Sequence, residues 1–342
     1  MTGTNTRGLK RNGRSSTEAD ALYPANEADP LAELRSRRIG LALAGGGVLA
    51  AAHVGVLAAL QEAGLTVSAV SGVSAGALVG TLWASGLEIE QLQKMTTVFG
   101  FRDLDLQARA LLLPWLAHRR PGLIRGDRLE KRLGRLVPIS DLSEAVRPCA
   151  IVTTDLAQFT PVIFASQAKA VENRPVTVGG RTARYVVGGP VPRILRASMA
   201  VPFLFAPVAH GDRLLVDGGI AELVPTDVVR ALGTDYVIGV DLTPRPEDVG
   251  DVQRLSPIDA FSLSFRYLQD SVPALKPDLT IRPEFKSRVA ILDFRRQEAC
   301  MQAGYDAAYA TLKSLAIPGA ALCTPALPPV TARHLQTAKP GA

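Results

Sequence analysis

Ser74 lies at the centre of the pentapeptide Gly72-Val73-Ser74-Ala75-Gly76, between a short β-type run and a helical pattern. A G-x-S-x-G sequence at a strand-to-helix turn is typical of a nucleophile elbow, because small residues two positions before and after the serine let its hydroxyl project from a tight turn. The same pentapeptide occurs by chance in chains rich in Gly, Ala and Ser, and Ser74 could instead cap the helix that follows. The sequence therefore offers Ser74 as a candidate nucleophile.

A glycine cluster, Gly45-Gly46-Gly47, follows a β-type run and precedes a second helical pattern. Glycine lets the backbone turn sharply and present N–H groups with no side chain in the way. At a helix N-terminus such groups are unpaired and lie at the positive end of the dipole, which suits a phosphate or the oxyanion of ester hydrolysis. Close packing of a strand against a helix also selects glycine. The spacing matches neither a dinucleotide-binding G-x-G-x-x-G pattern nor a phosphate loop.

A nucleophilic serine needs a base, and the four histidines are poorly placed for that role: His53, His118, His210 and His334. The usual order at this elbow is serine, acid and then histidine, and the one late histidine, His334, falls in a Pro-rich tail. Asp217 is a better candidate, because it ends an apolar run and precedes Gly218 and Gly219. Desolvation could raise its pKa from about 4 far enough to accept a serine proton. The alternative is that Asp217 only orders its own turn.

Strands alternate with helices along the chain, as in proteins built from βαβ units on a largely parallel sheet. The apolar segment 45–60 approaches the length of a membrane span, but its glycines separate a β-like run from a helical one, which favours a strand–loop–helix unit in a buried core. We expect strands at Ile39–Ala44, Val67–Val70, Cys149–Thr153, Leu214–Val216 and Tyr236–Val240, and helices at Ala51–Ala63, Ala75–Ser85, Thr226–Leu232 and Arg296–Leu312.

The length and amino-acid composition indicate a globular protein with a large core. A chain of 342 residues that is 47% hydrophobic can bury a large core, and a net charge of +6 with only 5% aromatic residues does not indicate nucleic-acid binding. The three cysteines lack metal-ligand spacing and no secretory signal is apparent, so we expect a cytoplasmic protein. Residues 1–30 and 318–342 read as flexible tails, polar and Pro/Ala-rich respectively, around one domain at 31–317.

Together, the glycine loop, the elbow and the Asp-Gly-Gly turn resemble the patatin-like phospholipases, most of all their compact bacterial members. The resemblance extends, in the right order, over most of 39–315, including 150-AIVTTDLAQFTPVIF-164, 197-ASMAVPFLFAPV-208 and 225-PTDVVRALGTDYVIGVDL-242. It implies an α/β fold of three layers, α/β/α, with a mainly parallel central sheet. It also implies a catalytic dyad without histidine, acting on a lipid ester through an acyl-enzyme, with no metal and no cofactor.

The resemblance assigns roles to residues of this chain as follows: Ser74 as nucleophile, Asp217 as base, Gly45, Gly46 and Gly47 as the oxyanion hole, Gly72 and Gly76 as elbow glycines, and Gly218 and Gly219 as the turn after the base. His53 is expected to pack behind the glycine loop. Two departures stand out. Leu49 occupies a position where the family commonly has arginine, which puts a preference for phospholipid in doubt. Residues 165–194 form a longer connection than expected, with a hairpin predicted around Gly179-Gly180; it could shape the acyl pocket or mediate assembly, or be a surface excursion.

A basic and apolar segment at residues 101–137 could bring the protein into contact with lipid. Residues 101–137 contain nine Lys/Arg and four Asp/Glu, so they carry most of the excess positive charge of the chain, and they place Leu112 and Trp115 beside basic residues. This mixture suits an anionic membrane surface, and we expect a cap that touches lipid and covers the site. The alternative is a pair of helices with a solvated basic face.

The sequence thus predicts a serine lipid acyl hydrolase of the phospholipase A, lysophospholipase or carboxylesterase type, cytoplasmic and in peripheral contact with the inner membrane surface. Two alternatives remain: a non-catalytic lipid-binding or regulatory protein of the same fold, and an α/β-hydrolase-type esterase with a histidine base. The head group, chain length, sn-position, balance of hydrolysis and transacylation, and oligomeric state are not predicted.

Overall fold

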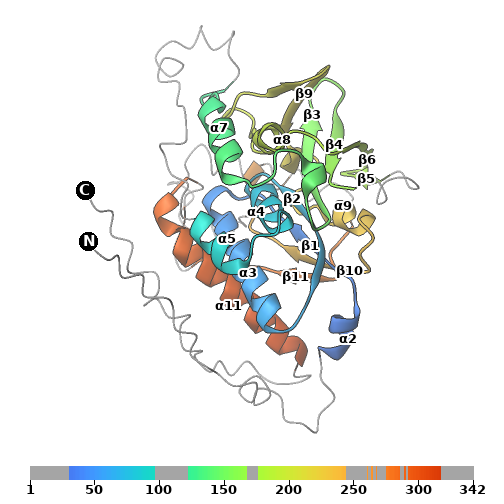
Figure 1. Ribbon diagram of the computed structural model, residues 1–342, viewed down its shortest axis with the longest axis vertical. Helices are drawn as coiled ribbons and strands as arrows, with labels where there is room; N and C mark the ends of the chain where they lie inside the picture. Colours follow the sequence, from blue (N-terminus) through green and yellow to red (C-terminus); the bar gives the residue numbers. More distant parts are fainter. Residues whose placement is uncertain are drawn as a thin grey trace, which may run out of the picture.

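The computed structural model describes residues 31–96, 122–167, 176–243, 275–285 and 292–316, together with the single positions 260, 263, 264, 267 and 289 (Figure 1). The two predicted tails and residues 101–121 of the predicted cap lie outside these ranges, so those predictions stay untested. Within the described residues, no helix is both long enough and apolar enough to cross a membrane.

A nine-stranded sheet forms the centre of the described structure, with the order β11-β10-β1-β2-β3-β4-β7 and with β9 joining β3 to β8. The five strands β11, β10, β1, β2 and β3 run parallel to one another, whereas β4 and β9 are antiparallel to β3. The mainly parallel sheet is therefore confirmed. Its strands are β1 (Ile39–Leu43), β2 (Val67–Val73), β3 (Cys149–Asp155), β4 (Thr160–Ala165), β7 (Arg184–Val187), β8 (Val208–His210), β9 (Arg213–Asp217), β10 (Tyr236–Val240) and β11 (Leu279–Ile281).

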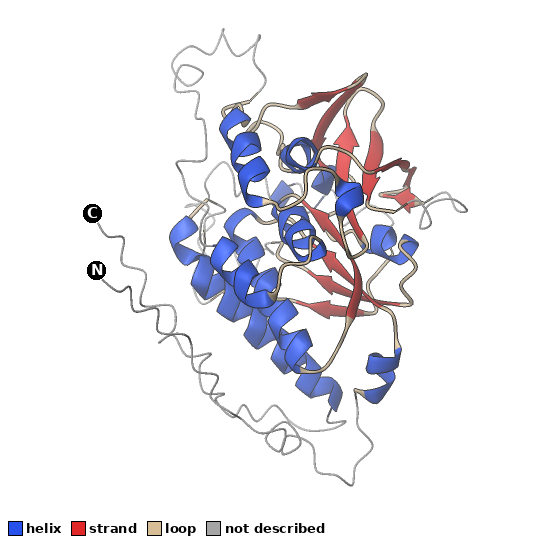
Figure 2. Ribbon diagram, viewed as in Figure 1, coloured by secondary structure: helices blue, strands red, loops and turns tan. Residues whose placement is uncertain are grey.

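Helices cover both faces of this sheet, as Figure 2 shows. The parallel strands are buried on both faces, which is why they read as continuous apolar runs rather than alternating ones. The helices are α2 (Ala32–Ser36), α3 (Ala51–Glu62), α4 (Ala75–Ala84), α5 (Ile89–Thr96), α7 (Asp127–Leu136), α8 (Val191–Ser198), α9 (Thr226–Ala231) and α11 (Gln297–Ala316).

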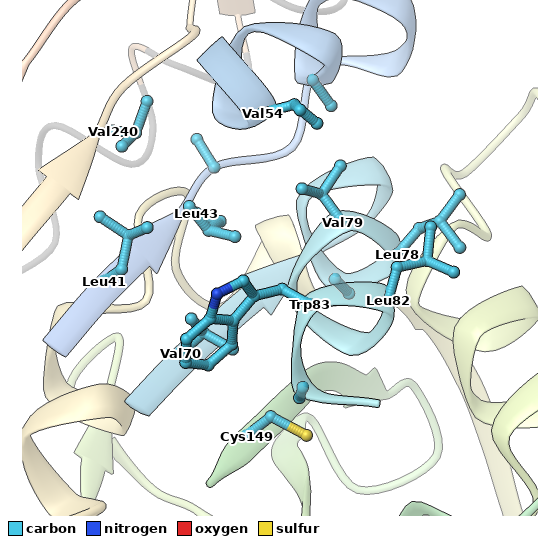
Figure 3. Packing of buried hydrophobic residues seen from close by; sticks show 14 of the residues in the cluster. Leu41, Leu43, Val54, Val70, Leu78, Val79, Leu82, Trp83, Cys149 and Val240 are labelled. Carbon is cyan, nitrogen blue, oxygen red and sulfur yellow. The ribbon is translucent and has the colours of Figure 1, made fainter. Parts of the chain in front are cut away.

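The larger core lies on the face covered by α3, α4 and α11, where Leu41, Leu43 and Val70 meet Leu82 and Trp83 (Figure 3). Helices α3 and α11 pack closely because each has a glycine at the contact. A Cβ on Gly55 would lie 1.9 Å from the carbonyl oxygen of Met301, and one on Gly304 would lie 1.9 Å from that of Ala52. Small residues at these positions let the two backbones touch.

The opposite face of the sheet packs against α9. There Ala42 of β1 and Val237 of β10 form a smaller cluster with Val229 of α9. Alternate residues of one strand therefore serve different cores, since side chains along a strand point to opposite faces. The two covered faces complete the three-layer α/β/α arrangement.

Each predicted strand and helix is present within a few residues of its predicted bounds. The largest difference among the strands is β2, which continues three residues past Val70 to Val73. Ser71 pairs with β1 and β3 in this extension, and its buried hydroxyl is satisfied by donating to the carbonyl oxygen of Pro225 at 2.6 Å. The predicted hairpin is also confirmed: β5 (Thr177–Val178) pairs with β6 (Arg181–Thr182) around Gly179 and Gly180, both with positive φ.

The described part of the predicted cap is the amphipathic helix α7. Leu129 and Leu133 are buried against the core, whereas Arg128, Lys131 and Arg135 are exposed. Leu129 and Leu133 of α7 thus pack against the protein. The predicted contact of the cap with lipid stays a prediction, because Leu112 and Trp115 lie outside the described residues.

Candidate active site

Ser74 lies at a sharp turn between β2 and α4. Its backbone has φ 54° and ψ −126°, a conformation that few residues other than glycine adopt. The serine occupies the N-cap position of α4, but its side chain makes no capping hydrogen bond. The alternative in which Ser74 merely caps the helix is therefore wrong, and the hydroxyl remains available for chemistry.

The two glycines of the elbow are required by close contacts. A Cβ on Gly72 would lie 2.5 Å from the Cα of Ala77, and one on Gly76 would lie 2.4 Å from the carbonyl oxygen of Ala44. Both distances are far below van der Waals contact, so a side chain at either position would push α4 away from the sheet. The glycines permit the sharp turn that places Ser74 between β2 and α4.

Asp217 ends strand β9, which runs antiparallel to β2 and ends beside it. The pairing of β2 with β3 is parallel and sets Val73 opposite Val152, while the pairing of β9 with β3 is antiparallel and sets Asp217 opposite Thr153. Because β4 occupies the other side of β3, β2 and β9 share one side and end on consecutive residues of β3. The residue after Val73 is Ser74, so the candidate nucleophile and base meet where the two strands end.

The Asp217 carboxyl is buried, and this burial raises its pKa to about 6. The backbone N–H of Gly219, which donates to Oδ1 at 2.8 Å, and the Ser74 hydroxyl act in the other direction, since both favour the charged form. Oδ2 is also buried and makes no hydrogen bond of standard geometry among the described residues, so the Ser74 hydroxyl interacts with the carboxyl without a full hydrogen bond to Oδ2. Asp217 thus has one oxygen that fixes the turn and one that can accept a proton.

The glycine loop lies directly beside Ser74. A Cβ on Gly45 would come within 3.1 Å of the Ser74 Cβ. Gly47 has φ 58° and begins the 3-10 helix η1 (Gly47–Ala50), which runs straight into α3. The first N–H groups of a helix have no acceptor within it, so the loop offers N–H donors at the positive end of the dipole near the serine.

His53 braces this loop from behind. Its buried Nε2 lies 2.8 Å from the carbonyl oxygen of Ala44, to which it donates in the tautomer that a carbonyl partner requires. Burial lowers the pKa of His53 to about 4, so the ring is neutral at physiological pH. The prediction that His53 packs behind the loop is confirmed.

The other histidines play no comparable part in the described structure. His210 lies on β8, its ring perpendicular to that of Phe164 with centroids 5.4 Å apart, and its pKa is lowered by burial and by Arg213 and Arg193. His118 and His334 lie outside the described residues. Across the described part of the chain, no group of three or more His, Cys, Asp or Glu residues is arranged to hold a metal ion.

Ser198 is the site residue that the sequence did not single out. Its Oγ accepts a hydrogen bond from the backbone N–H of Ser74 at 2.9 Å. The residue falls in the segment 197–208, which was noted only for its resemblance to a family pattern. A lone serine at the end of a helix carries no signal that it will contact a strand end 124 positions away.

The chain is similar to known proteins over much of its length. It is 28% identical over 275 residues to the neuropathy target esterase sws of Drosophila melanogaster, an alignment that covers 77% of this chain and 17% of the fly protein. It is 27% identical over 209 residues to the lysophospholipase nte1 of Aspergillus fumigatus, covering 61% of this chain and 12% of the fungal protein. The chain thus spans less than a fifth of the length of either relative.

Among solved structures, VipD from Legionella pneumophila is similar with a TM-score of 0.43 and 16% sequence identity, over 81% of this chain and 67% of that chain. The family model of the patatin-like phospholipases matches residues 41–230. That range is more than half of the 342 residues and contains the glycine loop, Ser74 and Asp217. The chain belongs to the patatin-like phospholipase family.

Proposed function

We propose that this protein is a serine acyl hydrolase that cleaves the carboxylic esters of lipids. The meeting of β2 and β9 on one side of β3 carries this proposal, because it sets Ser74 beside a buried carboxylate. A base works best when its pKa lies near the working pH. A pKa of about 6 places Asp217 much closer to that range than an exposed aspartate.

In the first half of the proposed reaction, the Ser74 hydroxyl gives its proton to Oδ2 of Asp217 while its oxygen attacks the ester carbonyl carbon. The carbonyl oxygen becomes an oxyanion, which the N–H groups of the Gly45-Gly46-Gly47 loop stabilise. The carbon–oxygen bond to the alcohol then breaks, and that alcohol leaves with the proton held by Asp217. The acyl group remains attached to Ser74 as an ester.

In the second half, water repeats these steps on the acyl-enzyme. Asp217 takes a proton from water, the resulting hydroxide attacks the acyl carbon, and the same N–H groups receive the oxyanion. The bond to the Ser74 oxygen breaks, the serine recovers its proton from Asp217, and the fatty acid is released. The chain's own residues supply the nucleophile, the base and the oxyanion donors.

The substrate class follows from the family and its relatives. The Aspergillus fumigatus relative is named a lysophospholipase and the Drosophila melanogaster relative an esterase. We therefore propose that phospholipids or lysophospholipids are substrates, reached by peripheral contact with a membrane surface.

Labelling with a fluorophosphonate probe tests the proposal, because the probe reacts covalently with activated serines. We expect the wild type to label, Ser74→Ala not to label, and Asp217→Asn to label far more slowly. Asp155→Asn is a matched control, since Asp155 is a buried aspartate on β3 whose Oδ1 binds the N–H groups of Ala157 and Leu214. This variant should label like the wild type.

A panel of phospholipids, lysophospholipids and neutral esters, with analysis of the released products, then identifies the substrate. Folded wild-type protein that neither labels nor releases fatty acid would refute the enzyme and favour a lipid-binding protein of this fold.

A further inference from the structure

Ser198, the last residue of α8, is fully buried and makes two hydrogen bonds through one hydroxyl. Its Oγ accepts from the N–H of Ser74 at 2.9 Å and donates to the carbonyl oxygen of Val152 at 2.7 Å. The donated bond fixes the direction of the hydroxyl hydrogen. An oxygen lone pair is therefore left facing Ser74.

The residues just after Ser198 also bind the backbone of Asp217, the candidate base. The carbonyl oxygen of Ala200, two residues after Ser198, accepts from the N–H of Asp217 at 3.1 Å. The backbone N–H groups of both Ser74 and Asp217 are thus bound by the three-residue segment 198–200. The separation of nucleophile and base is set by this segment as well as by the sheet.

Val152 contacts both Ser198 and the turn that follows Asp217. It lies opposite Val73 in the pairing of β2 with β3. Its carbonyl oxygen accepts from Ser198, and Gly218 packs so closely on that oxygen that a Cβ there would lie 2.3 Å away. The turn after Asp217 therefore rests on the same carbonyl group that orients Ser198.

We propose that Ser198 is a positioning residue that holds the strained backbone of Ser74 at the correct distance from Asp217. The proposal rests on the proposed function, because it assigns a role within that reaction. A residue with φ near +54° persists only where its surroundings hold it. Loss of the Ser198 hydroxyl would leave the buried N–H of Ser74 without its acceptor and let the elbow relax.

Helix α8 does not depend on Ser198 for its own placement. Arg196 of the same helix donates to the carbonyl oxygens of Arg125 and Ala206 at 2.6 and 2.8 Å. Its guanidinium also lies over the ring of Phe205, 5.1 Å from the centroid. Removal of one hydroxyl should leave these contacts in place, so the effect should fall on the elbow.

The test compares Ser198→Ala with Ser166→Ala. Ser166 makes the same kind of bond at the other end of β3, where its buried Oγ accepts from the N–H of Cys149 at 3.0 Å. Both variants lose a serine acceptor for a backbone N–H, but only one loses it at the elbow. Ser198→Cys serves as a further variant, because its sulfur leaves no cavity at the site but accepts hydrogen bonds only weakly.

The readouts are kcat and KM on a soluble short-chain ester, and the rate of fluorophosphonate labelling. We expect Ser198→Ala and Ser198→Cys to lower kcat and the labelling rate about 10- to 100-fold, since a misplacement near 1 Å can reduce catalysis about 100-fold. KM should stay within about twofold, because the fully buried Ser198 acts through the elbow rather than on the substrate. Ser166→Ala should keep the wild-type kcat.

Each outcome bears on the proposal. A kcat for both Ser198 variants within twofold of the wild type would overturn it, as would an equal loss of kcat in Ser166→Ala, which would indicate a general effect of lost stability. If the wild type labels and only these comparisons fail, the proposed function stands. A wild type that does not label overturns the proposed function and the role of Ser198 with it.

Discussion

Replacing Asp217 by asparagine should sharply lower activity and stabilise the protein at the same time. Burial raises the pKa of this carboxyl from its ordinary 3.8 to about 6 in the folded protein. One pKa unit corresponds to about 1.4 kcal/mol, so above pH 6 the ionised carboxylate lowers the free energy of unfolding by about 3 kcal/mol. Because asparagine carries no charge, Asp217→Asn should recover most of this lost free energy of unfolding.

The sign of the effect follows from the two pKa values. Below pH 3.8 the carboxyl is protonated in both the folded and unfolded states, and the wild type has no electrostatic penalty. Between pH 3.8 and about 6 the folded state holds the proton more tightly, so stability falls as pH rises. Above pH 6 the carboxyl is ionised in both states, so the free energy of unfolding lost through this group no longer changes with pH.

The asparagine can reproduce most contacts of the carboxyl. Its Oδ1 can accept from the Gly219 N–H as before, and its Nδ2 can donate to the Ser74 hydroxyl oxygen, which accepts hydrogen bonds. We therefore expect Asp217→Asn to gain about 2–3 kcal/mol at pH 7–8 and little at pH 3.5. Loss of the base should lower kcat about 100- to 10,000-fold.

Urea unfolding at several pH values between 3 and 8 measures this difference, because contributions from all other carboxyls cancel between the two proteins. Ser74→Ala is the matched control: it is also expected to be inactive, but it keeps the Asp217 carboxylate and its pH-dependent loss of stability. Unfolding free energies that differ by the same amount at every pH would refute the argument, as would an Asp217→Asn variant with wild-type kcat.

Three further predictions concern the proposed dyad and the elbow. First, kcat/KM should fall about tenfold per pH unit below pH 6 as Asp217 is protonated; a flat profile down to pH 5 would contradict this role. Second, Gly76→Ala should lose at least about 2 kcal/mol of stability and most fluorophosphonate labelling, because its Cβ would lie 2.4 Å from the Ala44 oxygen; unchanged melting and labelling would show that the turn relaxes freely. Third, removing residues 317–342, which include His334, should leave kcat unchanged, and a complete loss of activity in the folded truncated protein would favour a histidine base.

Local patterns in the sequence predicted the parts of the site that are local. The elbow glycines, the glycine loop and the Asp-Gly-Gly turn each require particular residue types within a few positions, and the structure shows the close contacts that impose Gly72, Gly76 and Gly218. The buried strands were predictable for a similar reason, because a parallel strand covered on both faces needs an uninterrupted apolar run.

The non-local parts could not be predicted from those patterns. The run that ends in Asp217 indicates a strand but not its partner, and the antiparallel pairing of β9 with β3 decides where the carboxyl lies. The contact of Ser198 with Ser74 depends on how α8 sits against the end of β2. Such contacts follow from packing between distant segments, which a single sequence does not encode as a local pattern.

The glycine loop shows why the family's arginine is dispensable for the structure of this site. Leu49 occupies that position and is buried, and a Cβ on Gly46 would lie 3.3 Å from the Cβ atoms of both Leu49 and Leu242. Apolar contacts therefore support the loop on one side, while the neutral His53 ring holds the Ala44 carbonyl on the other.

None of these supports is an ion pair, so the loop should keep its shape at high salt, where charge pairs weaken. What the leucine at position 49 does remove is a fixed positive charge beside the proposed oxyanion donors. A phosphate group near the loop would then meet backbone N–H groups but no cation from this residue. We therefore expect the proposed hydrolase to discriminate little between lipid esters with anionic and neutral head groups, and Leu49→Arg to shift its preference toward anionic ones.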